Sequence, residues 1–136
     1  MLPPYLSDDT LNRILEAALD EDVGPGDVTT EATIPNGTHA EARIVAKESG
    51  IVAGLEAAAR VFHLVSDTTA LRWAQEDGTA VSAGDVVGTL TGSAAALLTA
   101  ERLALNLLQR MSGIATATHR MVQAARPHRA EILDTR

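Results

Sequence analysis

One long apolar stretch decides the fold of this chain: residues 97–113 read LLTAERLALNLLQRMSG. Apolar side chains occur almost all round the helix that this stretch predicts, a pattern typical of a buried helix. At about 100° per residue, four of the residues that break this pattern fall within a stripe roughly 60° wide: Arg102, Asn106, Gln109 and Gly113. The sequence therefore predicts a buried helix with one narrow polar line. We expect it to run from about residue 94 to residue 125, interrupted or tightly packed around Ser112-Gly113, and to end before Pro127.

Arg102 heads this polar line, and its spacing alone leaves two interpretations open. The planar guanidinium is a donor fork suited to carboxylate or phosphate, which makes Arg102 a candidate anion-binding residue. Charged stripes on helices, however, usually face water or pair with a nearby acid. Spacing by itself favours that second interpretation.

The flanking segments predict a mixed α+β chain. Residues 11–19 carry one apolar stripe, so we expect a helix capped by Ser7, Asp8 or Asp9 and ended by Gly24-Pro25-Gly26. Residues 27–30 lead into a turn expected at Pro35-Asn36-Gly37, and a short helix is expected at residues 55–65. Alternating patterns between turn residues predict strands at residues 42–47, 51–53, 71–75 and 86–90.

The last segment, Ala130-Glu131-Ile132-Leu133, predicts a further strand with polar groups following it at Asp134, Thr135 and Arg136. A natural protein rarely ends on an apolar strand with polar groups just emerging. We therefore expect the chain to be the first part of a longer protein.

Composition and charge narrow the function classes. The 136 residues hold no cysteine and carry a net charge of −7, which argues against disulfides and against non-specific binding to nucleic acid. The N-terminus lacks signal-peptide features, and no apolar run approaches the ~20 residues of a membrane span, so a soluble cytoplasmic protein with no membrane partner is expected. Residues 1–101 carry 5 basic and 16 acidic side chains, whereas residues 102–136 carry 6 basic and 2 acidic ones. An arginine-rich end on an acidic body suggests a local anion site, although solvated surface charge is the better explanation for most of these arginines.

Four motifs, in order along the chain, carry a family resemblance. They are residues 21–30 (EDVGPGDVTT), Trp73 followed by Asp77-Gly78 and Gly84-Asp85, residues 101–116 (ERLALNLLQRMSGIAT) and residues 132–136 (ILDTR). Together they resemble the N-terminal portion of the quinolinate phosphoribosyltransferases, the carboxylating nicotinate-nucleotide pyrophosphorylases. The resemblance implies an N-terminal α/β sandwich of the hammerhead type at residues 1–113, including the long helix. It further implies that residues 114–136 form a helix and the first strand of a truncated catalytic α/β barrel.

The resemblance also implies a reaction and a site. The family condenses quinolinate with phosphoribosyl pyrophosphate to give nicotinate mononucleotide, pyrophosphate and carbon dioxide in de novo NAD biosynthesis, with Mg2+ required. By motif, Arg102 would bind a quinolinate carboxylate in the active site of a second subunit, within a homodimer or higher homo-oligomer. Thr135 and Arg136 would bind substrate in their own subunit. Catalytic residues and Mg2+ ligands are expected in the missing portion, so the fragment alone should be inactive.

Three alternatives stay open. The turns at Asp77-Gly78 and Gly84-Asp85 resemble those of biotinyl or lipoyl carriers, although Lys47, the only lysine, is followed by a predicted helix rather than set on a tight hairpin. A paralogue such as the molybdenum-transport-associated protein would share the fold but not the substrate, and the Glu101-Arg102 pair favours the quinolinate enzyme. A structural dimerisation module is the third. The four histidines lack metal-ligand spacing, so no metal site is predicted within this chain.

Overall fold

The computed structural model describes residues 6–24, 26–126 and 128–134. The chain begins with α1 (Asp8–Val23), because Ser7 accepts a hydrogen bond from the amide of Thr10 and caps the helix start. The helix ends at Gly24, whose φ of 59° suits a residue without Cβ. These boundaries agree with the predicted first helix. A short helix, α2 (Val28–Thr33), follows in a segment for which no helix was predicted.

Three antiparallel strands form the main sheet, in the order β1 (His39–Val45), β5 (Val86–Ser93) and β3 (Ala70–Trp73). Glycine in the central strand makes room for the only tryptophan, since Gly88 pairs directly with Trp73. A second, two-stranded sheet joins β2 (Gly50–Ile51) to β4 (Ala80–Val81). The four strands predicted between residues 42 and 90 are therefore present, with β2 shorter than expected.

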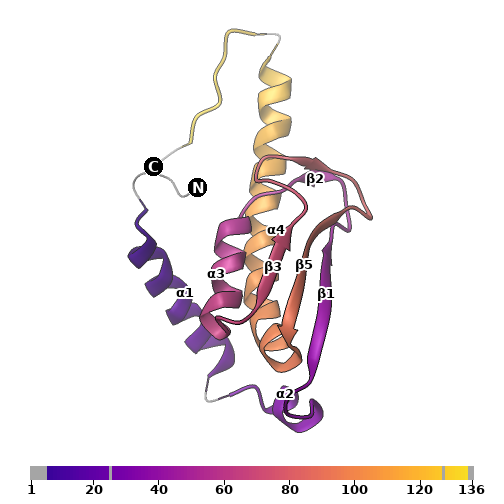
Figure 1. Cartoon of the computed structure of the whole chain (residues 1–136). Helices are drawn as coiled ribbons and strands as arrows, with labels where there is room; N and C mark the ends of the chain where they lie inside the picture. Colours follow the sequence, from indigo (N-terminus) through magenta and orange to yellow (C-terminus); the bar gives the residue numbers. More distant parts are fainter. Residues whose placement is uncertain (1–5, 25, 127, 135–136) are drawn as a thin grey trace.

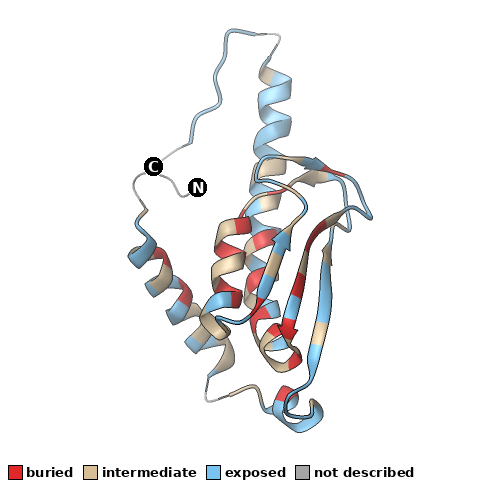
Figure 2. Ribbon diagram, viewed as in Figure 1, coloured by how far each residue is buried: buried red, intermediate tan, exposed pale blue. Residues whose placement is uncertain are grey.

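Two helices complete the sandwich: α3 (Leu55–Val65) and α4 (Ala94–Ala125). The long helix α4 lies against β1 and β5, and α3 packs along α4 (Figure 1). Helix α1 contacts both α3 and α4. The buried hydrophobic side chains come mainly from α1, α3, β5 and α4 and are mostly small or aliphatic; among the described residues, Phe62 is the only buried aromatic ring. Figure 2 shows them concentrated where the helices meet the sheet. The α+β class and the sandwich arrangement are thus confirmed.

The expected burial of the long helix is wrong for much of its surface. Leu97, Ala100, Ala104 and Leu108 form its buried line, while other apolar side chains are exposed: Leu98, Met111, Ile114, Met121 and Val122. Within one chain, the other elements cover only one face of α4. The later turns of α4 extend past the sandwich (Figure 2). The helix also passes through Ser112 and Gly113 without a break, and a Cβ on Gly113 would meet no atom within 4 Å.

The predicted strand at residues 130–133 is not formed. Residues 130–134 have no strand pairing and are exposed, with Leu133 76% accessible. A strand needs a neighbour to satisfy its backbone donors and acceptors, and the first strand of a barrel would find that neighbour in later strands. No helix in the described part of the chain is both long and apolar enough to cross a membrane.

Candidate functional site

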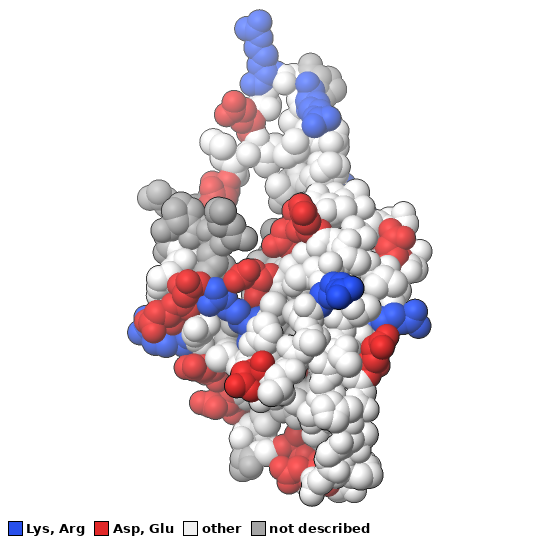
Figure 3. All heavy atoms as spheres, viewed as in Figure 1, with Lys and Arg blue, Asp and Glu red and all other residues white. Residues whose placement is uncertain are grey.

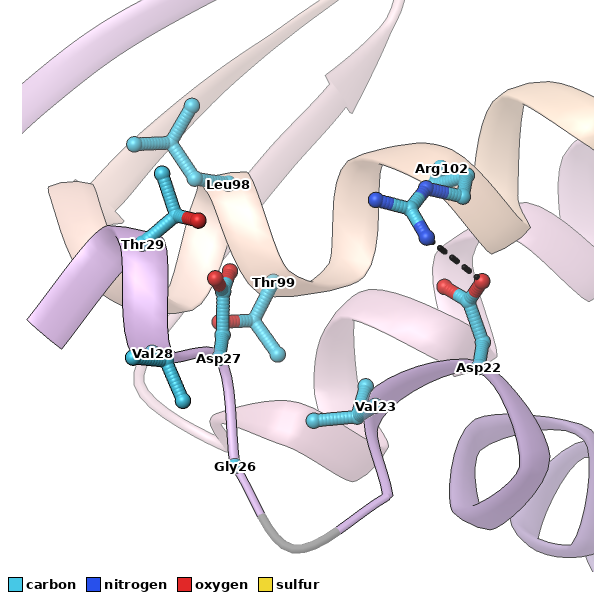
Figure 4. A pocket seen from close by; sticks show the side chains of 9 residues that line it. All are labelled: Asp22, Val23, Gly26, Asp27, Val28, Thr29, Leu98, Thr99 and Arg102. Atoms are coloured by element: carbon cyan, nitrogen blue, oxygen red, sulfur yellow. Dashed lines mark hydrogen bonds and ion pairs between the residues drawn. The ribbon is translucent and has the colours of Figure 1, made fainter.

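An open pocket lies where the end of α1, the start of α2 and the first turns of α4 meet (Figure 4). Its volume is about 240 Å3, and its lining combines acidic, hydroxyl, apolar and basic groups: Asp22, Val23, Gly26, Asp27, Val28, Thr29, Leu98, Thr99 and Arg102. Small-molecule sites usually enclose about 300–1,000 Å3. A pocket below that range fits one side of a binding site better than a whole one.

Arg102 is the only basic residue in this lining, and it is held by an acid. Its Nη1 donates a hydrogen bond to Oδ1 of Asp22 at 3.1 Å. The Arg102 side chain is 73% exposed, whereas that of Asp22 is only 24% exposed. The sequence interpretation of Arg102 as an ion-paired, solvent-facing residue is therefore confirmed as a description of this chain. Because one terminal nitrogen is engaged and the side chain is open, the group is still able to bind an anion.

The rest of the polar line also faces solvent, since Asn106, Gln109 and Gly113 are all exposed. The structure thus confirms that the four residues of the predicted polar line share one exposed face of α4. It runs along a surface face of α4 that begins at the pocket.

Asp27 organises the opposite wall of the pocket. Its carboxylate accepts hydrogen bonds from the Thr30 amide at 3.1 Å and the Thr30 hydroxyl at 2.6 Å, which caps α2. The hydroxyl of Thr99 on α4 donates a longer bond of 3.4 Å to the same group. The Thr30 side-chain bond chiefly lowers the pKa of Asp27, with the Thr30 amide, Thr99 and the charge of Arg102 acting in the same direction. The Asp27 carboxylate therefore links α2 to α4 through hydrogen bonds from both helices.

Sequence reasoning singled out Arg102 but missed its acidic partners. A helix-capping pattern, Asp27 followed by Thr30 at the third position, was the available signal for α2. No local signal pairs Asp22 with Arg102, which is 80 residues further along the chain.

Two further site residues were predicted from the family resemblance. Thr135 and Arg136 lie outside the described residues. Of the described arginines at this end, Arg102, Arg110 and Arg120 lie on α4, and Arg126 and Arg129 follow it. Figure 3 shows basic side chains at the far tip of the molecule. In the described ranges, no three histidine, aspartate or glutamate side chains gather closely enough to hold a metal ion.

Comparisons with known proteins agree with the motifs. The family model described as "Quinolinate phosphoribosyl transferase, N-terminal domain" matches residues 27–112. A quinolinate phosphoribosyltransferase [decarboxylating] 1b from Nicotiana tabacum is 44% identical over 135 residues, covering 98% of this chain and 38% of the relative. A probable nicotinate-nucleotide pyrophosphorylase [carboxylating] from Synechocystis is 42% identical, covering 99% of this chain and 44% of the relative.

A solved structure agrees as well. The crystal structure of NadC from Streptococcus pyogenes superposes with a TM-score of 0.92 at 38% identity, covering 98% of this chain and 48% of that one. The chain thus spans about two fifths of the length of the curated relatives it matches. These matches give no support to the carrier alternative. The chain belongs to the quinolinate phosphoribosyltransferase family, whose N-terminal domain it carries.

Proposed function

We propose that this chain supplies the substrate-capping domain of an enzyme that condenses quinolinate with phosphoribosyl pyrophosphate. The products would be nicotinate mononucleotide, pyrophosphate and carbon dioxide. The observation that carries the proposal is Arg102, a guanidinium 73% exposed beside an open pocket, within the family-matched residues 27–112. The relatives are a quinolinate phosphoribosyltransferase and a probable nicotinate-nucleotide pyrophosphorylase, and these activities indicate the reaction.

In this proposal Arg102 binds a quinolinate carboxylate and offsets its charge. Quinolinate carries two carboxylates on a pyridine ring, and a guanidinium matches a carboxylate with two parallel hydrogen bonds. The ring nitrogen carries no proton, so its attack on the ribose carbon needs no base from this domain. The role of Arg102 is therefore substrate binding and orientation.

The length of α4 favours a site shared between two subunits. Arg102 and Arg126 are separated by 24 steps of helix, or about 36 Å at the usual rise per residue. The nine steps from Arg126 to Thr135 span at most about 32 Å when fully extended. Arg102 and the proposed ligands Thr135 and Arg136 would therefore meet most easily when they come from different copies of the chain, as a homodimer or larger assembly would allow.

Several parts of the proposal concern residues beyond this match. Remaining substrate ligands, catalytic residues and the Mg2+ expected with phosphoribosyl pyrophosphate are assigned to the portion of the relatives that this chain does not cover. We also propose the division into a sandwich domain at residues 1–113 and barrel elements at 114–136, although α4 itself runs through that boundary. A cytoplasmic location remains part of the proposal.

The test uses the full-length protein that continues past residue 136, with formation of nicotinate mononucleotide followed by chromatography. We expect activity with quinolinate and phosphoribosyl pyrophosphate together, and none with either alone. Arg102→Ala should raise the KM for quinolinate strongly, while Arg43→Ala, an exposed change on β1, should not. An inactive unmodified protein, or equal quinolinate affinity in Arg102→Ala and wild type by calorimetry, would contradict the proposal.

Subunit mixing tests the shared site. An Arg102→Ala subunit, combined with one defective in its own barrel, should recover part of the activity, because one site in the mixed dimer is then intact. Absence of recovery in verified mixed dimers would count against sharing.

A further inference from the structure

The two partners of the Asp22–Arg102 ion pair differ in how firmly each is held. Asp22 lies in the last turn of α1 with its side chain 24% exposed. The turn behind it is fixed by the bond from the Gly24 amide to the Asp20 carbonyl at 3.0 Å and by that from the Gly26 amide to the Val23 carbonyl at 3.3 Å. The guanidinium of Arg102 lies at the end of a long side chain that is 73% exposed. This side chain has many accessible rotamers, so fixing it in one costs conformational entropy. The fixed carboxylate therefore restrains the flexible guanidinium, rather than the reverse.

The contact leaves the useful part of the guanidinium free. Asp22 accepts from Nη1, so the edge formed by Nε and Nη2 is not used by this pair. That edge carries two parallel N–H groups, the arrangement that binds a carboxylate through two hydrogen bonds. Figure 4 shows a second terminal nitrogen pointing away from Asp22. Asp22 and a substrate carboxylate are thus able to occupy the same arginine together.

The position of Asp22 is unfavourable for α1 taken alone. Asp20, Glu21 and Asp22 lie at the C-terminal end of the helix, where the dipole disfavours negative charge, and the last turn of α1 has no basic residue. Arg102 is the cation that offsets this charge at Asp22. An acid that weakens its own helix and holds one exposed arginine points to a role at the site.

We propose that Asp22 is a positioning residue, which holds Arg102 so that its Nε–Nη2 edge faces the substrate carboxylate. The inference rests on the proposed function, because it assigns Asp22 to the same site. Asp22 does not touch substrate; it acts through Arg102. Removing its charge should weaken quinolinate binding even though it makes the site less acidic, since the arginine then loses its anchor.

The experiment measures steady-state kinetics of the full-length protein with quinolinate varied. Asp22→Asn should raise the KM for quinolinate by about three- to tenfold, with kcat nearly unchanged, as expected when binding rather than chemistry is affected. Asp22→Glu should recover part of the loss. Glu21→Gln removes the neighbouring exposed carboxylate, which has no side-chain partner among the described residues, and should behave as wild type. In an Arg102→Ala background, Asp22→Asn should have no further effect on KM.

The possible failures are distinguishable. A wild type without activity overturns the proposed function itself. With an active wild type, an unchanged or lower KM in Asp22→Asn overturns the positioning role. An equal loss from Asp22→Asn with and without Arg102 overturns it too, because the effect would then not pass through the arginine.

Discussion

The hydroxyl oxygen of Thr116, on α4, accepts a hydrogen bond of 2.8 Å from the backbone amide of Ile51 in β2. One turn earlier, the Ser112 hydroxyl accepts from the Ala53 amide at 3.0 Å and donates to the Ala53 carbonyl at 3.2 Å. Two residues of the Ser-Gly-Ile-Ala-Thr motif thus bind the backbone of one short segment to α4. The motif therefore has a structural function in this chain.

We predict that Thr116→Val destabilises the chain by about 1–3 kcal/mol, because it leaves a partly buried amide without an acceptor while keeping the side-chain shape. Urea unfolding followed by circular dichroism measures the change. Thr118→Val, on an exposed position of the same helix, is the control and should have little effect. Equal effects of the two changes would mean that the Ile51 bond contributes nothing.

Gly88→Ala should destabilise the sheet by about 1–3 kcal/mol. A Cβ at this position would lie 2.5 Å from Cε3 of Trp73 and 3.3 Å from the Arg72 carbonyl oxygen, so either the indole or the strand must move. Gly113→Ala is the control in the opposite direction: it faces open space in the middle of α4 and should stabilise the isolated chain by about 0.5–1 kcal/mol. Thermal unfolding of both variants tests whether Gly88→Ala lowers the melting temperature and Gly113→Ala raises it.

Arg60 joins α1 to α3, and Arg60→Met should lower stability by about 1–2 kcal/mol. Its guanidinium contacts Asp8, donates to Asn12 at 3.1 Å and to Glu56 at 3.0 Å, and its side chain is only 22% exposed. Arg13 pairs with Asp9 at 3.5 Å, but both side chains are more than two thirds exposed. We therefore expect Arg13→Met to change the unfolding free energy by less than about 0.5 kcal/mol; a similar loss in both would argue against a special role for Arg60.

The pKa of Asp27 should lie below its ordinary value of 3.8, chiefly because of the Thr30 hydroxyl. A lowered folded-state pKa means that this carboxylate adds stability above pH 3.8, which is lost as the pH falls through the folded pKa. An NMR titration of the Asp27 side-chain carbon gives the value directly. Thr30→Val, at a buried position, should move that pKa back up, and no movement would refute the assigned cause.

Local patterns were enough to predict much of the fold. The Ser7 cap, the end of α1 at Gly24 and the full extent of α4 all depend on a few neighbouring residues, and the structure confirms each. Local patterns could not predict which distant segments pack against one another. The apolar residues around most of the helix at residues 97–111 predicted burial there, but burial depends on what is available to cover a face. The strand expected at residues 130–133 failed for the same reason.

The candidate site divides in the same way. Helical spacing identified Arg102 and the polar line, because both belong to one helix. Asp22 and Asp27 reach the pocket through the turn around Gly24 and Gly26, whose direction depends on backbone angles rather than on hydrophobic pattern. The ion pair that decides the orientation of Arg102 was therefore visible only in three dimensions.

The contact between Trp73 and Gly88 also gives the molecule a built-in optical reporter. Trp73 is the single tryptophan, and it sits on β3 against the central strand. Its emission should follow the pairing of β3 with β5, whereas the far-ultraviolet circular dichroism should be dominated by the 32 residues of α4. If the two signals change together during denaturation, sheet and helix unfold as one cooperative unit. If the emission changes at a lower denaturant concentration than the circular dichroism, the sheet unfolds while α4 is still helical.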